Sequence, residues 1–187
     1  MKKENKILDS LKDVFEIEGK VKRKLRVSIK ADRKNVSSIL LYLKLQKGYI
    51  HLNHISCVDW IEENEFELIY IVWNPKNKLT VLVHTRLDRE NPVMENIDTI
   101  WDQANTYERE FREMFGIEFP GLVGRKEFIL EGWNDIPPMR KDFDSQAYAK
   151  ENFFIRPGRE DAQDVREAIQ KRSGETIPDF AKKYSRD

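Results

Sequence analysis

The hydrophobic pattern of this chain changes its period once, and that change limits the folds open to it. Between Arg23 and Thr85, apolar and polar residues alternate in four stretches, as they do in half-buried β-strands. From Ile97 the apolar spacing becomes about 3.6 residues, which predicts one helix over 97–115 that ends before Gly116. Strands followed by a helix in this way indicate an α+β domain.

The predicted strands lie at 23–30, 49–59, 66–73 and 79–85, with a turn at 74–77. Two more helical patterns occur, one at 8–15 before Gly19 and one between Asn35 and Gly48. We therefore expect an α+β fold with a mixed or antiparallel sheet of about four strands, two to three packed helices and an extended C-terminal arm. The region 120–143, which contains the pair Pro137-Pro138, is predicted to be ordered loop.

Three segments are expected: an N-terminal helical segment at 1–20, a central domain at 21–143 and an arm at 144–187. The arm has one short helical pattern at 162–171. Apolar side chains spaced through a polar tail are unfavourable in water unless a partner covers them. We therefore predict that the arm docks on another protein through Phe153, Phe154, Ile155, Phe180 and Tyr184.

Composition excludes several classes of function. The 33 Lys and Arg balance the 33 Asp and Glu, so no excess positive charge favours nucleic acid or anionic lipid. The single cysteine, Cys57, allows no internal disulfide and falls short of the four thiolates usual for an iron–sulfur cluster. We expect no signal peptide and no membrane span, because no run of about 18 apolar residues occurs.

The helix predicted over 97–115 carries an acidic residue within its apolar face. Glu108 lies at helical spacing in the middle of that face. A carboxyl group there either has a raised pKa or finds a cation, and Arg112, four residues on, is placed for such a pair. Alternatively, Glu108 lies at a shallow end of the face. The apolar face comprises Ile97, Ile100, Trp101, Ala104, Phe111 and Phe115.

The opposite side of this helix carries Arg109, Glu110 and Glu113. Such a charged face is commonly no more than solvated surface. It is also suited to fixing a neighbouring polypeptide, because a guanidinium group pairs with carboxylates through two parallel hydrogen bonds.

Two motifs resemble the 30-kDa subunit family of respiratory complex I. The segment Ile100–Phe119 reads IWDQANTYEREFREMFGIEF and matches the family signature at W, A-N, E-R-E and F-G-I. The segment Pro138–Phe143 reads PMRKDF and matches a second motif, a proline followed by Leu or Met, then R-K-D and an aromatic residue. The resemblance covers about Val27 to Asp142, since the strand pattern and the Val58-Asp59 pair are also similar to the family's domain.

Departures from the family pattern indicate a branch. The family often has Gly-His-Pro where this chain has Gly-Leu-Val-Gly at 121–124, and Pro137 stands where His is frequent. In these respects the chain is similar to the branch found with membrane-bound, ferredoxin-linked hydrogenases and related archaeal complexes.

The resemblance implies a scaffold subunit of an energy-converting oxidoreductase that performs no chemistry by itself. Members of the family hold no prosthetic group and lie against a large subunit that resembles a nickel–iron hydrogenase catalytic subunit. Iron–sulfur clusters and any metal centre are expected on partner subunits, which hold this chain peripherally at the cytoplasmic face of the membrane. The alternative is a free-standing protein-binding module with a charged docking helix.

The two motifs predict a single interface. We expect the charged residues of 108–113 and the loop residues Met139, Arg140, Lys141 and Asp142 to meet in one ion-pair network that locks the loop onto the helix. Trp101 is expected to belong to the same structural site.

A possible metal site involves His51, His54 and Cys57. On a helix these three side chains would share a face and could bind zinc. The surrounding residues favour a strand, on which positions 51 and 54 are expected to point to opposite sides. We therefore predict no metal site here.

Overall fold

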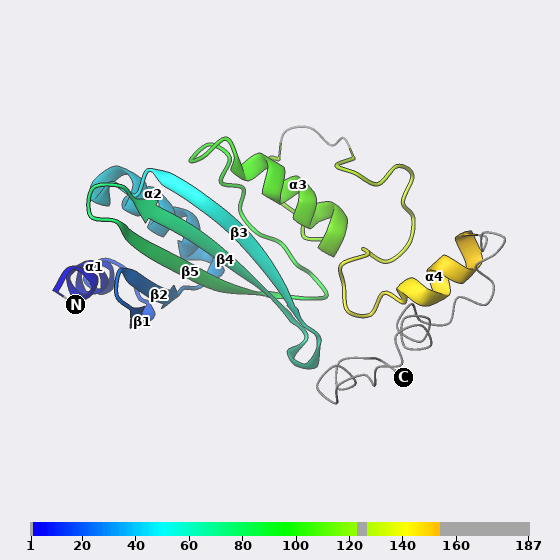
Figure 1. The fold of residues 1–187 in the computed structure, drawn as a ribbon, viewed down its shortest axis with the longest axis horizontal. Helices are drawn as coiled ribbons and strands as arrows, with labels where there is room; N and C mark the ends of the chain where they lie inside the picture. The colour runs from blue at the N-terminus through cyan, green and yellow to red at the C-terminus, as the bar shows by residue number, and fades with distance from the viewer. Residues whose placement is uncertain (1, 123–126, 154–187) are drawn as a thin grey trace, which may run out of the picture. The chain divides into compact units, whose positions relative to one another are not determined.

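A computed structural model describes residues 2–122 and 127–153 (Figure 1). Internal contacts divide the chain into two units, residues 1–143 and 144–187, which are described separately. Within the described residues, no helix is long and apolar enough to cross a membrane.

The first unit is built on a five-stranded sheet, which confirms the α+β prediction. Strands β3, β4 and β5 form an antiparallel ribbon, and β5 then pairs in parallel with β2, so the sheet is mixed. The chain enters the sheet through the β1–β2 hairpin, crosses to the far edge through α2, and returns through β4 and β5 to fill the centre. The spatial order is β1 (Glu18–Arg23), β2 (Arg26–Lys30), β5 (Leu79–Asp88), β4 (Glu65–Asn74) and β3 (His51–Trp60).

Strand β1 was not predicted from the sequence. Its residues are mostly exposed and charged, so they lack the apolar alternation that marks a strand. The predicted strand 23–30 also begins later than expected, because the chain turns at Leu25, whose φ is 61°. Pairing with β2 is what makes residues 18–23 a strand, and this pairing does not depend on local pattern.

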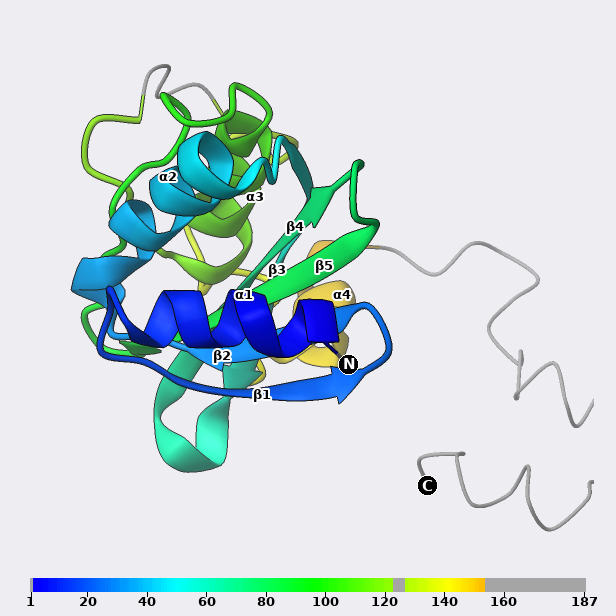
Figure 2. The ribbon, with the colours of Figure 1, turned by 90° about the vertical axis from the view of Figure 1, so that its left-hand side faces the viewer.

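Three helices pack on one face of the sheet: α1 (Lys2–Lys12), α2 (Val36–Lys47) and α3 (Ala104–Phe115) (Figure 2). The sheet residues that join their core, such as Val83 and Tyr70, share one side of the ladder. Residues of the opposite side, such as Ile69 and Leu82, are half-buried. The core holds Leu8 and Leu11 of α1 beside the sheet residues.

Helix α3 begins seven residues later than predicted. Residues 97–103 form turns in which the Trp101 amide donates to the Ile97 carbonyl, 3.1 Å. Ile97 is nevertheless fully buried, so its place in the apolar pattern indicates burial and not a helical conformation. The predicted end is confirmed: Gly116 closes α3 with φ 76°, a left-handed conformation that favours glycine.

The described part of the second unit is helix α4 (Ser145–Asn152), which the sequence pattern did not predict. Asp144 caps this helix by accepting from the amides of Gln146 and Ala147, both 3.0 Å. Phe153 is exposed, with its ring edge-on to Tyr148. The predicted helix at 162–171, and Phe154, Ile155, Phe180 and Tyr184, lie outside the described residues.

Candidate functional site

A buried ion pair joins two segments that are far apart in the sequence. Asp59 on β3 and Arg89, which directly follows β5, are both buried. Arg89 Nε donates to Asp59 Oδ1 at 2.9 Å, and Arg89 Nη2 donates to Oδ2 at 3.2 Å. This two-point geometry fixes the planar guanidinium group relative to the sheet.

The ion pair also holds the 137–143 loop. Arg89 Nη2 donates to Asp142 Oδ1 at 2.7 Å, and the Lys141 amide donates to Asp59 Oδ2 at 2.8 Å. Arg140 Nη2 donates in turn to the Arg89 carbonyl at 3.2 Å. The PMRKDF motif thus binds β3 and the end of β5 through both its side chains and its backbone.

Electrostatics favour the charged forms of this cluster. Hydrogen bonding to Asp59 raises the pKa of Arg89 above its ordinary value, although burial opposes the charge. The Arg89 guanidinium holds the pKa of Asp142 below its usual range. Because one guanidinium serves two carboxylates, loss of Arg89 would leave Asp59 buried without a cation.

Two guanidinium groups lie near the ring of Phe66 on β4. The distances from the Arg89 and Arg140 Cζ atoms to the ring centroid are 5.7 Å and 5.4 Å. The Phe66 ring also meets Phe115 of α3 edge-on, with centroids 5.9 Å apart. Phe66 therefore links the loop motif to the end of the helix motif through the core.

A second anchor is Glu113 on α3. Its carboxylate accepts from three successive loop amides: Phe128 at 2.5 Å, Ile129 at 2.8 Å and Leu130 at 2.9 Å. Burial opposes ionisation of Glu113, but these hydrogen bonds outweigh it and lower the pKa of the carboxyl group. Arg109 adds a donor to the Glu127 carbonyl at 2.9 Å.

The loop also meets the C-terminal end of α3 directly. The Met139 amide donates to the Met114 carbonyl at 3.0 Å, which satisfies one of the free carbonyls at the helix end. Pro137 packs on Gly116, where a Cβ atom would come within 3.3 Å of the proline ring. A glycine is thus needed at position 116 for its left-handed backbone and for this close approach.

The predicted single ion-pair network is not what brings the loop and helix together. Within the described residues, Arg140 and Asp142 contact Arg89, whereas Arg109 and Glu113 contact loop backbone. The two sets of charges therefore anchor two different stretches of one loop. Sequence alone could not separate them, because Arg89 lies in a polar stretch that matches neither motif.

Glu108 lacks the cation that its spacing from Arg112 predicts. Arg112 lies near Glu118 instead, with Nε and Oε2 3.9 Å apart. Glu108 is 1% exposed; its Oε1 accepts from the Ile97 amide at 2.8 Å, and its Oε2 has no hydrogen-bond partner within the described residues. Burial raises the pKa of Glu108 to about 7, which is the other alternative left open by the sequence.

Trp101 performs a structural task at the sheet edge. Its indole Nε1 donates to the Ile50 carbonyl at 2.9 Å, next to β3, and Gln103 donates to the Leu52 carbonyl. Since β3 has a neighbour on one side only among the described strands, these side chains satisfy backbone acceptors that the sheet leaves free. Glu110 is half-buried, and the Lys141 side chain is exposed.

The anchored loop presents apolar side chains to solvent. Singly exposed apolar residues are ordinary, whereas exposed apolar residues that lie together mark contact surfaces. We call the following three residues the loop ridge: Ile129, 66% exposed, Ile136, 43% exposed, and Met139, 57% exposed.

His51, His54 and Cys57 do lie on a strand, as predicted, but the reasoning about their directions was wrong. A register shift between Leu52 and His54 places His51 opposite Trp73 and His54 opposite Ile71, on the same side of β4. Cys57 pairs with Leu68, on the other side. Among the described residues, no three His, Cys, Asp or Glu side chains are grouped to hold a metal ion.

Comparison with known proteins gives the family. Residues 29–149 match the family model described as the respiratory-chain NADH dehydrogenase 30 Kd subunit. A subunit of the F(420)H(2) dehydrogenase of Methanosarcina mazei is 27% identical over 132 residues, 68% of this chain and 81% of the relative. A subunit of the NADH-quinone oxidoreductase of Moorella thermoacetica is 28% identical over 106 residues, 57% of this chain and 72% of the relative.

A solved structure agrees with these matches. A chain in the membrane-bound sulfane sulfur reductase, described as an archaeal respiratory membrane complex, aligns with TM-score 0.72 and 30% identity. The alignment covers 83% of this chain and 93% of that one. The W, E-R-E and F-G-I positions of the sequence lie in α3 or next to its ends. The family model spans all of these positions. The chain belongs to the family of the respiratory-chain NADH dehydrogenase 30-kDa subunit.

Proposed function

We propose that this chain is a non-catalytic scaffold subunit of a complex I-like, membrane-bound, energy-converting oxidoreductase, and that it braces a hydrogenase-like large subunit. The observation that carries the proposal is the loop ridge, an exposed apolar surface on a loop that Arg89, Asp59 and Glu113 hold in place. A fixed surface loses little conformational entropy on binding, so it favours a permanent contact.

The assignment to a membrane-bound, energy-converting complex rests on the relatives. One similar chain is part of a membrane-bound sulfane sulfur reductase, and another is a subunit of an F(420)H(2) dehydrogenase. By this analogy the chain is held peripherally at the cytoplasmic face by other subunits, and iron–sulfur clusters and any metal centre are on those subunits. The isolated, untagged chain should contain no stoichiometric iron, nickel or zinc, and elemental analysis tests this.

The alternative of a free-standing module that docks through a charged helix is weaker. Arg109 and Glu113, the charges that would dock, are engaged with the chain's own loop. Helix α3 therefore acts through the loop it anchors, and the loop ridge is the surface left to contact a partner.

Co-expression with the large subunit tests the proposal. The double variant Ile136→Ser, Met139→Ser should reduce copurification of the large subunit by about tenfold or more, because apolar anchors at the centre of an interface commonly cost more than 1 kcal/mol each when truncated. The matched control is Leu45→Ser, since Leu45 on α2 is an apolar residue that is even more exposed, at 66%. Normal copurification by the double variant would rule out the loop ridge as the docking surface.

A further inference from the structure

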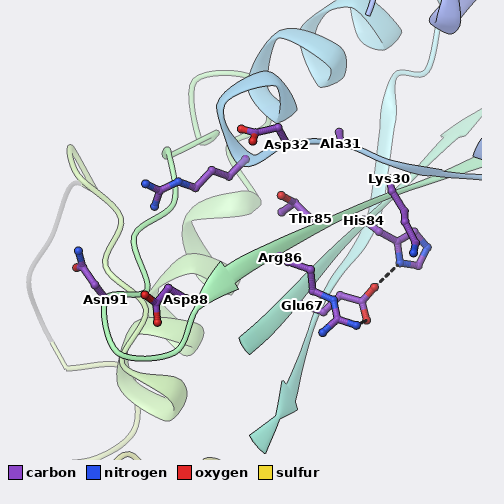
Figure 3. Close-up of a pocket in the computed structure, with 10 residues that line it drawn as sticks. Lys30, Ala31, Asp32, Glu67, His84, Thr85, Arg86, Asp88 and Asn91 are labelled. Atoms are coloured by element: carbon purple, nitrogen blue, oxygen red, sulfur yellow. Dashed lines mark hydrogen bonds and ion pairs between the residues drawn. The ribbon is translucent and has the colours of Figure 1, made fainter. Parts of the chain in front are cut away.

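The open face of the sheet contains a groove outside the site described above. It lies where β2 ends beside β5, has a volume of about 410 Å³, and is lined by charged and polar side chains (Figure 3). Lys30, His84, Glu67 and Arg86 line one end of it. None of these four residues belongs to the two family motifs or to the anchored loop.

The carboxylate at this end, Glu67, is fully engaged within the chain. Its Oε1 lies 2.9 Å from His84 Nδ1, its Oε2 accepts from Trp60 Nε1 at 2.9 Å, and Arg86 Nη2 lies 3.8 Å from Oε2. Burial opposes ionisation, but the hydrogen bonds from His84 and Trp60 outweigh it and lower the pKa of Glu67. An ionised Glu67 requires that His84 Nδ1 carry a proton and donate it.

The other carboxylates of the groove are engaged as well. Asp32 accepts from the Lys34 amide at 2.9 Å, and Asp88 accepts from the Glu90 amide at 2.9 Å. Each therefore stabilises a local turn, and neither is placed to neutralise a cation at the His84 end.

Two nitrogen atoms at this end of the groove, in contrast, have no partner among the described residues. The exposed Lys30 side chain forms no hydrogen bond or ion pair with another described residue, and His84 Nε2 is buried without a hydrogen-bond partner among them. Register places the two residues directly opposite each other on the parallel strands β2 and β5. Lys30 and His84 thus form a corner in which Glu67, the carboxylate that contacts His84, is already paired.

Apolar residues continue from this corner across the open face. Ile69 is the cross-strand partner of His84, and Ile71 is the partner of Leu82, all on the same side of the sheet. These three aliphatic side chains are half-buried and lie on central strands. A free inorganic anion would leave them exposed, whereas a polypeptide with an acidic side chain beside apolar ones would cover them and supply the missing acceptor.

We propose that the Lys30–His84 corner receives an Asp or Glu carboxylate of a partner subunit, whose neighbouring apolar residues lie on Ile69, Ile71 and Leu82. The inference rests on the proposed function, because it needs an assembly, and it adds a second docking surface on the opposite side of the sheet from the helices. Lys30 supplies the charge and the hydrogen-bond donors, and His84 lies directly opposite it in the β2–β5 ladder.

Glu18 is the rival for Lys30. It lies opposite Lys30 in the β1–β2 ladder, with no ion pair to it within 4.0 Å in the described structure. If Lys30 pairs with Glu18 in solution, the corner has no charge to offer a partner, so the experiment must distinguish these two carboxylates.

The purified assembly tests the proposal through a zero-length cross-link. A carbodiimide joins an amine to a carboxylate only when the two are in contact, with loss of water and no spacer. We expect mass spectrometry to find Lys30 joined to an Asp or Glu of a partner subunit. A cross-link from Lys30 to Glu18 alone, or none from Lys30, would overturn the proposal.

Two variants complete the test. Lys30→Arg should abolish the cross-link and keep the assembly intact, because a guanidinium retains the charge and does not react. Lys30→Gln should abolish the cross-link and weaken retention of the chain in low salt by roughly tenfold, with little further effect in high salt, where the ion pair is screened. Lys24→Gln, at the exposed β1–β2 turn, should change neither the cross-link nor the retention. Wild-type retention of Lys30→Gln in low salt would also overturn the proposal.

The outcomes separate this inference from the proposed function. If the chain fails to copurify with a large subunit at all, the scaffold function fails. If it copurifies and depends on the loop ridge, but Lys30 gives no partner cross-link, only the second surface is wrong. Binding of acetate by the isolated chain, together with the absence of a cross-link in the assembly, would assign the corner to a free anion and reject a partner carboxylate.

Discussion

Two buried carboxyl groups in this domain differ in how their negative charge is compensated. Asp59 is 4% exposed and receives two hydrogen bonds from Arg89 and one from the Lys141 amide. Glu108 is 1% exposed and receives one hydrogen bond, from the Ile97 amide. Desolvation disfavours both charges, but of the two only Asp59 has a buried cation beside it in the part of the chain that the structure describes.

The difference shows where a partner for a buried acid comes from. Asp59 is paired with a residue 30 positions away, and the sheet register brings them together. Glu108 has an arginine four positions away on the same helix, yet Arg112 turns to Glu118. We infer that the Asp59 cluster holds the loop in place, whereas Glu108 is a source of pH sensitivity in the core.

The largest expected effect comes from removing the cation of the first pair. Arg89→Met should lower the free energy of unfolding by about 3–5 kcal/mol, because it leaves Asp59 buried without its partner. Urea unfolding measures this change. Arg23→Met is the control, since Arg23 is exposed on β1. Equal stability of the two variants would remove the distinction between the two carboxyl groups.

Glu108→Gln should have the next largest effect on the free energy of unfolding, and it should raise that free energy, whereas Arg89→Met lowers it. The folded pKa of Glu108 is raised to about 7 from 4.5, so the folded protein holds this proton more tightly than the unfolded chain does. The wild type should therefore lose stability as the pH rises from about 4.5 to about 7. Above that range the Gln variant, which carries no charge, should be more stable by about 1–3 kcal/mol.

Thermal or urea unfolding of both proteins at pH 5 and pH 8 checks the Glu108 prediction. The expected result is a smaller difference at pH 5 than at pH 8. A variant that is less stable than the wild type at pH 8 would show that the carboxylate has a partner in solution, and that the two acids are alike after all.

A third test concerns the second anchor of the loop. Glu113→Gln should weaken three charge-assisted hydrogen bonds and cost about 1 kcal/mol. Hydrogen exchange of the Phe128, Ile129 and Leu130 amides should become faster, while exchange of the Lys141 amide, held by Asp59, should not change. Equal acceleration at both places would show that the two anchors form one network.

The smallest effect is expected at the exposed end of the Asp59 cluster. Asp142→Asn should cost less than about 1 kcal/mol, because 38% of the Asp142 side chain is exposed and solvent screens the ion pair. The folded pKa of Asp142 is depressed, so its contribution is present above the unfolded value of 3.8 and disappears as the pH falls. Denaturation at pH 7 and pH 3 measures the cost of the substitution and its dependence on pH. A loss of stability as large as that of Arg89→Met would contradict the prediction.

Much of the fold could be predicted because its signals are local. Strand β4 alternates buried and half-buried residues over its whole length, and that period is visible in the sequence. Gly48 and Gly116 end α2 and α3 in left-handed conformations, as predicted. Strand β1 and the delayed start of α3 were missed, because pairing with β2 and the burial of Ile97 are tertiary effects.

The candidate site was predictable in its parts but not in its connections. The loop does meet α3, where the Met139 amide donates to the Met114 carbonyl, but Glu113 holds residues 128–130 and the charges of 140–142 contact Asp59 and Arg89. Asp59 stands out in the sequence only through the family resemblance, and Arg89 does not stand out at all. The signal that could have found Asp59 is its position in the buried phase of a strand, shared with Ile55.

By itself, the sequence determined the alternation that makes the sheet, the helix ends, and the placing of an acid within the apolar face of α3. Only the tertiary structure decided which charges meet, because a guanidinium group and a carboxylate can pair across any separation in sequence once strand register fixes their positions. Asp59 and Arg89 meet because β3, β4 and β5 stand side by side. Among the described residues no cation pairs with Glu108, and Arg112, four positions on, lies beside Glu118 instead.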